Sequence, residues 1–289
     1  MSQYRIMTDS SCDLPAALAA ELELTVLPLT VTIDEKSYTN YLDEREITFK
    51  DCYAALRDGR EAKTAAANVD SFEQAMEPIL QAGEDILYLG FSSALSSTYN
   101  AGALAAEQLA EKYPDRKILT VDTLSASMGQ GLLVYLTVQQ KRAGATIEEA
   151  RDFAEKNKFH LCHWFTVDDL HHLRRGGRVS ATSAVLGTVL NIKPVLHMDN
   201  EGRLIFMEKV RGRRASIKRM LEKMRETAIE PEKQIVFMSH GDCIEDAEYL
   251  AGRIREEWNV EVVINYVGPV IGSHSGPGTL ALFFLGTER

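Results

Sequence analysis

Apolar and polar positions follow two alternating patterns over residues 1–160. Short apolar runs, typical of buried strands, are followed by longer segments whose apolar residues recur at helical spacing. The runs predict strands over 4–8, 24–33, 85–89 and 117–121, and the longer segments predict helices over 14–22, 49–56, 71–81, 93–112, 125–143 and 147–156. Because strands and helices alternate, we expect a parallel sheet covered by helices on both faces, which is a three-layer α/β domain.

The pattern changes after residue 160. Strands are predicted over 161–166, 193–197, 203–210, 234–239 and 261–267, and helices over 184–190, 214–227 and 244–258. The turn Asp199–Gly202 joins two of these strands in a hairpin. We therefore expect two α/β domains, a parallel-sheet domain over 1–160 and a mixed-sheet α+β domain over 161–289. The apolar stretch 280–285 is far too short to span a bilayer.

A turn rich in hydroxyl groups follows the apolar run 86–89. Gly90 breaks the run, and the hydroxyl residues of the turn are Ser92, Ser93, Ser96, Ser97 and Thr98. A following helix would leave backbone N–H groups free at its N-terminus, and such donors beside hydroxyls favour an anion. The predicted sequence of strand, turn and helix therefore indicates a seat for a phosphate or a carboxylate.

Polar turns also follow the strands predicted over 4–8 and 117–121. Carboxyl ends of strands line one crevice in open α/β sheets, so we expect all three turns to face the same space. Helix capping is the alternative for each turn taken alone. Near the C-terminus, glycines and prolines over 267–278 predict a tight loop that holds His274. A plain surface loop is the alternative there.

Charge and motifs exclude several classes of function. Residues 1–160 carry 15 Lys and Arg against 25 Asp and Glu, whereas residues 161–289 carry 17 against 17. An acidic chain is not expected to bind nucleic acid, because neutralisation of phosphates drives that binding. The sequence has no GxxxxGK[ST] loop, no complete dinucleotide fingerprint, no HExxH and no CxxC pair. The sequence has no secretory signal pattern, so we expect a cytoplasmic protein. Because the metal-binding motifs above are absent, we also expect no bound metal.

A basic segment, LRRGGR, lies over 173–178. Arginine forks suit phosphate oxygens, so Arg174, Arg175 and Arg178 are candidates for a phosphate or partner contact. A solvated basic turn is an equally good interpretation of the same residues.

Six segments in order resemble the DegV family. They are TDSSCDLP, FSSALSSTY, VDTLSASMGQG, LRRGGRVS, LNIKPVL with the later KVRGRRASI, and VGPVIGSHSGPG. Each segment alone is a weak signal, but together they cover the chain from end to end. The resemblance implies a two-domain fold with a long-chain fatty acid buried between the domains and no other cofactor.

The resemblance also implies which residues hold the acid. In the family the carboxylate is bound by a threonine, a serine of the hydroxyl-rich turn and the histidine of the C-terminal segment. By position these are Thr64, Ser93 and His274, and Ser92 and Ser96 are further candidates in the same turn. The family commonly has TSQPS at the threonine, whereas here Thr64 is followed by three alanines, 65–67. The shape of the pocket mouth is therefore expected to differ.

The family protein is a binding subunit and not an enzyme. It carries the acid to a separate ATP-dependent kinase, which phosphorylates the carboxylate for phospholipid synthesis, and arginines of the GGR segment are implicated in partner contacts. We accordingly expect this chain to have a kinase partner and at most transient contact with a membrane. A binder of small phosphorylated ligands is a further hypothesis, because relatives of the family include dihydroxyacetone kinase-type domains.

A serine hydrolase of acyl esters is the main alternative. The segment 90–94 approximates the GxSxG nucleophile elbow, with Ser92 as the nucleophile, and Asp242 and His274 follow in the order of an α/β-hydrolase triad. Ala94 replaces the second glycine of that motif. The neighbouring hydroxyls also suit anion binding better than one activated nucleophile, so we rank this alternative second.

Overall fold

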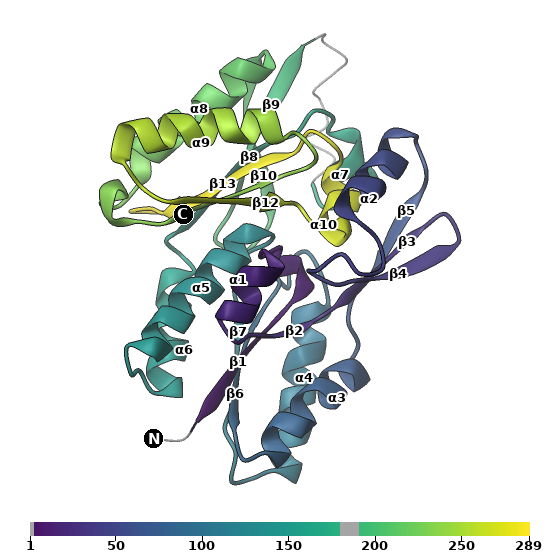
Figure 1. Cartoon of the computed structure of the whole chain (residues 1–289), viewed down its shortest axis with the longest axis vertical. Helices are drawn as coiled ribbons and strands as arrows, with labels where there is room; N and C mark the ends of the chain where they lie inside the picture. Colours follow the sequence, from purple (N-terminus) through teal and green to yellow (C-terminus); the bar gives the residue numbers. More distant parts are fainter. Residues whose placement is uncertain (1–2, 180–190) are drawn as a thin grey trace.

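The computed structural model describes residues 3–179 and 191–289 and contains three sheets (Figure 1). The helix expected over 184–190 lies outside the described residues. The first sheet is wholly parallel, in the order β2-β1-β6-β7. Its strands are β1 (Tyr4–Asp9), β2 (Thr25–Leu27), β6 (Asp85–Gly90) and β7 (Ile118–Asp122). Every residue of β6 is buried, which explains the continuous apolar run over 86–89 within it.

Helices cover both faces of the parallel sheet, as predicted. On one face lie α3 (Val69–Gln81) and α4 (Thr98–Lys112), packed through an apolar cluster that includes Phe72, Met76 and Tyr88. On the other lie α5 (Met128–Arg142) and α6 (Ile147–Asn157), and the short α1 (Ala16–Glu21) adds to their apolar cluster. Thr146 and Glu149 form a capping box that starts α6.

The second sheet has six strands in the order β10-β9-β8-β13-β11-β12. They are β8 (Leu161–Thr166), β9 (Ile192–Met198), β10 (Leu204–Arg211), β11 (Val236–His240), β12 (Val262–Tyr266) and β13 (Leu280–Leu285). Only β11 and β12 pair in parallel, so the sheet is mixed, and the β9–β10 hairpin is confirmed. Helices α8 (Arg213–Thr227) and α9 (Ile244–Trp258) share a cluster with one face of this sheet. The predicted α/β fold class is confirmed.

Helix α5 packs between the two large sheets. Nine of its residues are buried, and its apolar side chains share one cluster with β1 and β6 of the first sheet and with β8, β11 and β13 of the second. A helix that is buried on all sides is expected to lack a strong amphipathic pattern. The chain therefore has two lobes, one around each large sheet, that meet across α5. The boundary at 160/161 falls between α6 and β8 and stays a prediction.

A small antiparallel sheet corrects the prediction of one strand over 24–33. Pro28 separates β2 from β3 (Leu29–Ile33), and β3 leaves the parallel sheet to pair with β4 (Lys36–Asn40) and β5 (Ala62–Ala65). Proline lacks the N–H that a continuing ladder needs. Strands β4, β5 and β13 were not predicted. The remaining elements in the described parts of the chain are α2 (Phe49–Arg57), α7 (His171–Arg175), α10 (Pro269–Ser275) and 3₁₀ turns at Ser10–Cys12 and Pro231–Lys233.

Candidate functional site

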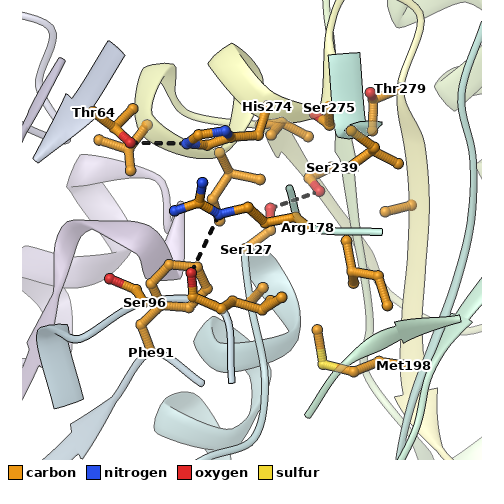
Figure 2. A pocket seen from close by; sticks show the side chains of 18 of the residues that line it. Thr64, Phe91, Ser96, Ser127, Arg178, Met198, Ser239, His274, Ser275 and Thr279 are labelled. Atoms are coloured by element: carbon orange, nitrogen blue, oxygen red, sulfur yellow. Dashed lines mark hydrogen bonds between the residues drawn. The ribbon is translucent and has the colours of Figure 1, made fainter. Parts of the chain in front are cut away.

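A cavity of about 320 Å³ lies where the carboxyl ends of the parallel strands face the second sheet (Figure 2). Most of its lining is apolar, with Phe91 and Leu95 from the first lobe and Phe165, Met198 and Phe283 from the second. This volume is at the lower end of the range for small-molecule pockets, about 300–1,000 Å³. An apolar space between two lobes, with a few polar groups in its wall, suits a ligand that is mostly hydrocarbon.

Thr64 and His274 meet in the wall of the cavity. Thr64 lies on β5, and its Oγ1 is 2.8 Å from Nε2 of His274 (Figure 2). His274 lies on α10, so the expected tight loop is wrong. Pro269 occupies the first turn of this helix, where its missing N–H costs nothing. Burial, and then the nearby charges of Arg178 and Arg175, lower the pKa of His274 to about 4, so its imidazole is neutral at pH 7.

The GGR segment supports this histidine. A Cβ at Gly176 would lie 2.4 Å from Nδ1 of His274, so a larger residue there would displace the ring. Arg178 also lines the cavity, and its Nε donates to the carbonyl of Leu95 across the lobes at 3.4 Å (Figure 2). Among the lining residues that the structure describes, Arg178 alone has a permanently charged side chain. Arg174 and Arg175 are exposed outside the cavity.

The hydroxyl-rich turn divides between two environments. Ser96 and Ser97 line the cavity, but Ser92 and Ser93 are not among the described lining residues. Ser92 is fully buried, and its Oγ donates to the carbonyl of Gly202 at 2.9 Å.

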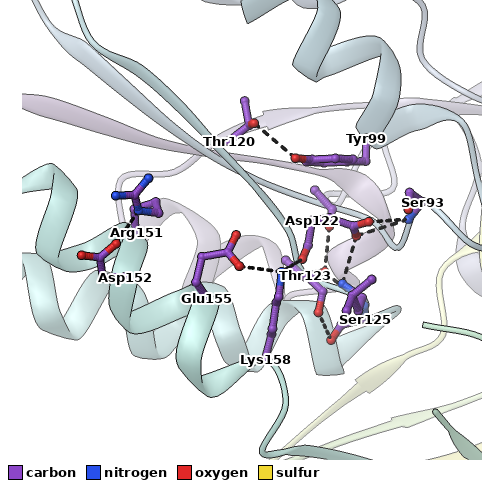
Figure 3. Close-up of polar contacts among 12 residues, drawn as sticks. Ser93, Tyr99, Thr120, Asp122, Thr123, Ser125, Arg151, Asp152, Glu155 and Lys158 are labelled. Carbon is purple, nitrogen blue, oxygen red and sulfur yellow. Dashed lines mark hydrogen bonds and ion pairs between the residues drawn. The ribbon is translucent and has the colours of Figure 1, made fainter. Parts of the chain in front are cut away.

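Ser93 lies beside the end of β7, where its backbone N–H donates to the Asp122 carboxylate at 3.3 Å (Figure 3). Helix α4 begins at Thr98 and not at Ser93, so the turn is longer than predicted. The hydroxyl of Ser92 and the backbone N–H of Ser93 therefore bond to groups outside the cavity lining. Of the five residues predicted to hold a carboxylate, the structure brings together Thr64, Ser96 and His274 in the lining.

The polar turn after β1 does not line the cavity, contrary to expectation. The Oγ of Ser10 instead accepts from the N–H of Leu29 at 2.9 Å. This bond holds the start of β3 against the end of β1.

A pair of serines, one from each lobe, also lines the cavity, and neither was among the predicted site residues. Ser127 precedes α5 and Ser239 lies on β11, and their Oγ atoms are 2.9 Å apart (Figure 2). Ser127 Oγ is also 2.5 Å from Oδ2 of Asp13, whose pKa is raised to about 8 by complete burial and, less strongly, by the charge of Asp9. Ser127 adopts φ 54° and ψ −147°, which is rare for a residue with a side chain. Sequence offered only the weak signal that Ser127 follows a parallel strand.

The hydrolase triad does not form. Ser92 pairs with a backbone carbonyl, His274 pairs with Thr64, and Asp242 forms an ion pair with Arg57 on α2. None of the hydrogen bonds of the described residues joins the three proposed triad members, so the predicted nucleophile has no base beside it. The described residues also contain no group of three or more His, Cys, Asp or Glu that could hold a metal ion.

The family model described as "Uncharacterised protein, DegV family" matches residues 3–287. The chain belongs to the DegV family. A DegV domain-containing protein of Clostridium perfringens is 46% identical over 290 residues, which is 100% of this chain and 99% of the relative.

Solved DegV structures share the whole fold. A DegV lipid binding protein from Thermotoga maritima superposes with a TM-score of 0.86 at 29% identity, over 99% of both chains. A DegV family protein from Thermus thermophilus, described for its fatty acid binding, gives a TM-score of 0.87 at 28% identity, over 98% of this chain and 99% of that one.

In the present DegV chain, no helix among the described residues is long and apolar enough to cross a membrane.

Proposed function

We propose that the protein binds one long-chain fatty acid in the cavity between its lobes, with the carboxylate at Thr64, His274 and Ser96. The observation that carries the proposal is the Thr64–His274 pair at one side of an otherwise mostly apolar cavity. The fatty acid and lipid binding described for relatives at 28% and 29% identity supports it.

The polar groups suit a carboxylate. When the neutral His274 ring donates its Nε2–H to Thr64 Oγ1, the Thr64 hydroxyl is free to donate to a carboxylate oxygen, and the Ser96 hydroxyl can donate to the same group. The half-buried Arg178 guanidinium supplies the opposite charge within the same lining. Burial of a carboxylate without such partners would make the free energy of binding less favourable by several kcal/mol.

The apolar walls supply the affinity. Burial of each methylene contributes about 0.8 kcal/mol, so roughly fourteen methylenes contribute about 11 kcal/mol before the costs of ordering. An acid of that length is therefore held mainly by its chain, and its carboxylate sets the orientation.

We further propose that the protein is a carrier without catalytic activity of its own, acting in the cytoplasm and presenting the carboxylate to a separate ATP-dependent kinase. The exposed Arg174 and Arg175, next to the cavity residue Arg178, are placed to contact such a partner. The failure of the triad to form supports a binding role over hydrolysis.

Mass spectrometry of gently extracted protein tests the binding proposal. We expect a stoichiometric long-chain acid, and we expect delipidated protein to regain one equivalent on titration. A protein that carries no acid and binds none on titration would refute the proposal.

The kinase proposal needs a separate test. Acid-loaded protein is mixed with a fatty acid kinase catalytic subunit and ATP, and acyl phosphate is trapped with hydroxylamine. The variant Arg174→Ala/Arg175→Ala should keep its affinity for the acid but lose acyl phosphate formation. If the wild type binds the acid but yields no acyl phosphate, only the role as a kinase subunit is refuted.

A further inference from the structure

The Ser127–Ser239 pair places hydroxyl groups in the cavity wall at a second position. One serine comes from each lobe, and both side chains line the cavity. In Figure 2 this pair is separate from the Thr64–His274 pair, and no hydrogen bond of the described residues connects the two pairs. An acid whose carboxylate lies at Thr64 and His274 would therefore bring part of its chain toward the two serines.

A chain of three groups sets the direction of hydrogen bonding at Ser239. Asp13 Oδ2 and Ser127 Oγ are 2.5 Å apart, and Ser127 Oγ and Ser239 Oγ are 2.9 Å apart. When Asp13 is protonated on Oδ2, its O–H donates to Ser127, which in turn donates to Ser239. The Ser239 hydroxyl hydrogen then has no acceptor among the described residues. When Asp13 is ionised, the direction reverses and Ser239 keeps free lone pairs. In both states the unused hydrogen-bonding capacity is on Ser239, which lines the cavity.

Other polar groups in the lining also lack partners. Ser275 Oγ is buried and has no partner among the described residues. Nδ1 of His163 is 3.0 Å from the carbonyl of Leu161, to which it can donate, and its Nε2 is then an acceptor that is buried and unpaired. Both atoms are buried, so a chain made only of methylenes leaves them without a hydrogen bond, which is unfavourable.

We propose that Ser127 and Ser239 form a second polar subsite, which binds a hydroxyl group carried on the acyl chain, so that the cavity selects hydroxylated long-chain acids over unsubstituted ones. This inference rests on the proposed function, because it requires an acyl chain in the cavity. A hydroxyl group both donates and accepts, so it complements Ser239 whichever way the hydrogen bonds run. In an entirely apolar cavity the same hydroxyl would weaken binding, because it would lose its water without gaining a partner.

Displacement of a fluorescent long-chain acid tests the subsite. Stearic acid is compared with a series of monohydroxystearic acids in which the hydroxyl position moves along the chain. We expect at least one position to bind about tenfold tighter than stearic acid, equal to about 1.4 kcal/mol. Ser239→Ala should abolish this preference, so that stearic acid and the preferred hydroxystearic acid bind with similar affinity. The matched control is Ser273→Ala, whose hydroxyl donates within α10 to the Pro269 carbonyl outside the cavity lining, and it should keep the preference.

The outcomes separate the subsite from the proposed function. If stearic acid binds but every hydroxystearic acid binds equally or more weakly, the subsite is refuted and the fatty-acid proposal stands. If the wild type binds none of the acids, the proposed function fails and the subsite fails with it. A preference that persists in both Ser239→Ala and Ser127→Ala also overturns the assignment. Should both variants fail to fold, the positional series on the wild-type protein decides alone.

Discussion

Replacement of Thr64 by valine tests the proposed carboxylate site most directly. Valine keeps the β-branched shape that suits strand β5 and removes only the hydroxyl. The change deletes the 2.8 Å contact with Nε2 of His274 and the proposed donor to the ligand. A hydrogen bond to a charged group contributes about 1.5–3 kcal/mol, which corresponds to a Kd about 10- to 150-fold higher. Thr64 is only half-buried, so we expect the lower end, about tenfold.

Displacement of a fluorescent acid from delipidated protein measures this change. Thr32→Val is the matched control, because Thr32 lies in the same small sheet and bonds the exposed Ser37 at 2.8 Å outside the cavity lining. The control should bind the acid within twofold of the wild type. Stabilisation by a saturating acid should fall for Thr64→Val by the same free energy, since ligand stabilisation follows RT ln(1 + [L]/Kd). If Thr64→Val binds as tightly as Thr32→Val, the carboxylate does not lie at Thr64.

Three further predictions concern the surroundings of the cavity. Gly176→Ala should displace the His274 ring and weaken acid binding at least fivefold in the same displacement assay. The control is Gly252→Ala, which lies in helix α9 with open space around it and should leave acid binding unchanged. Gly252→Ala should also raise the free energy of unfolding by about 0.5–1 kcal/mol. Because the pKa of Asp13 is raised to about 8, the folded state keeps a proton that the unfolded chain releases near pH 4, so stability contributed by Asp13 falls as pH rises from about 4 to 8. Asp13→Asn should make the free energy of urea unfolding less dependent on pH between about 7 and 8, where ordinary histidines with a pKa near 6.5 are mostly neutral, and an unchanged slope would contradict the assignment. Tyr53→Phe should lower the free energy of urea unfolding by about 1–3 kcal/mol, because the buried Tyr53 hydroxyl donates at 2.7 Å to the carbonyl of Val267, in the second lobe after β12. A decrease below about 0.5 kcal/mol would show that this bond does not hold the lobes together.

Local pattern predicted most elements because their cause is local. Strand β6 is an apolar run buried on both faces, and the β9–β10 hairpin follows from a turn of polar residues and glycine. Strand β13 was not predicted, because a run of six apolar residues does not by itself show that the segment is a strand in the middle of a sheet. The small sheet was missed for a related reason, since β4 and β5 are half-exposed and pair only through β3.

The site residues also divide into those that the sequence could indicate and those that only the packing of the two lobes decides. The resemblance pointed to Thr64 and His274, 210 positions apart in the chain, and the structure places them in contact. It could not decide which serines of the turn face the cavity, because that depends on where α4 begins and on the carbonyl of Gly202 from the other lobe. Ser127 and Ser239, 112 positions apart, had no sequence signal for their meeting.

The sequence by itself determined the alternation of strands and helices, the hydroxyl-rich turn after β6, the family and the absence of nucleotide-binding motifs. These properties depend on residue type and on near neighbours, so a single chain of letters contains them. Only the tertiary structure decided that α5 packs between both large sheets, and that Ser127 and Ser239 line the cavity whereas Ser92 and Ser93 do not. Those outcomes depend on strand order and on how two lobes pack, which join residues more than a hundred positions apart.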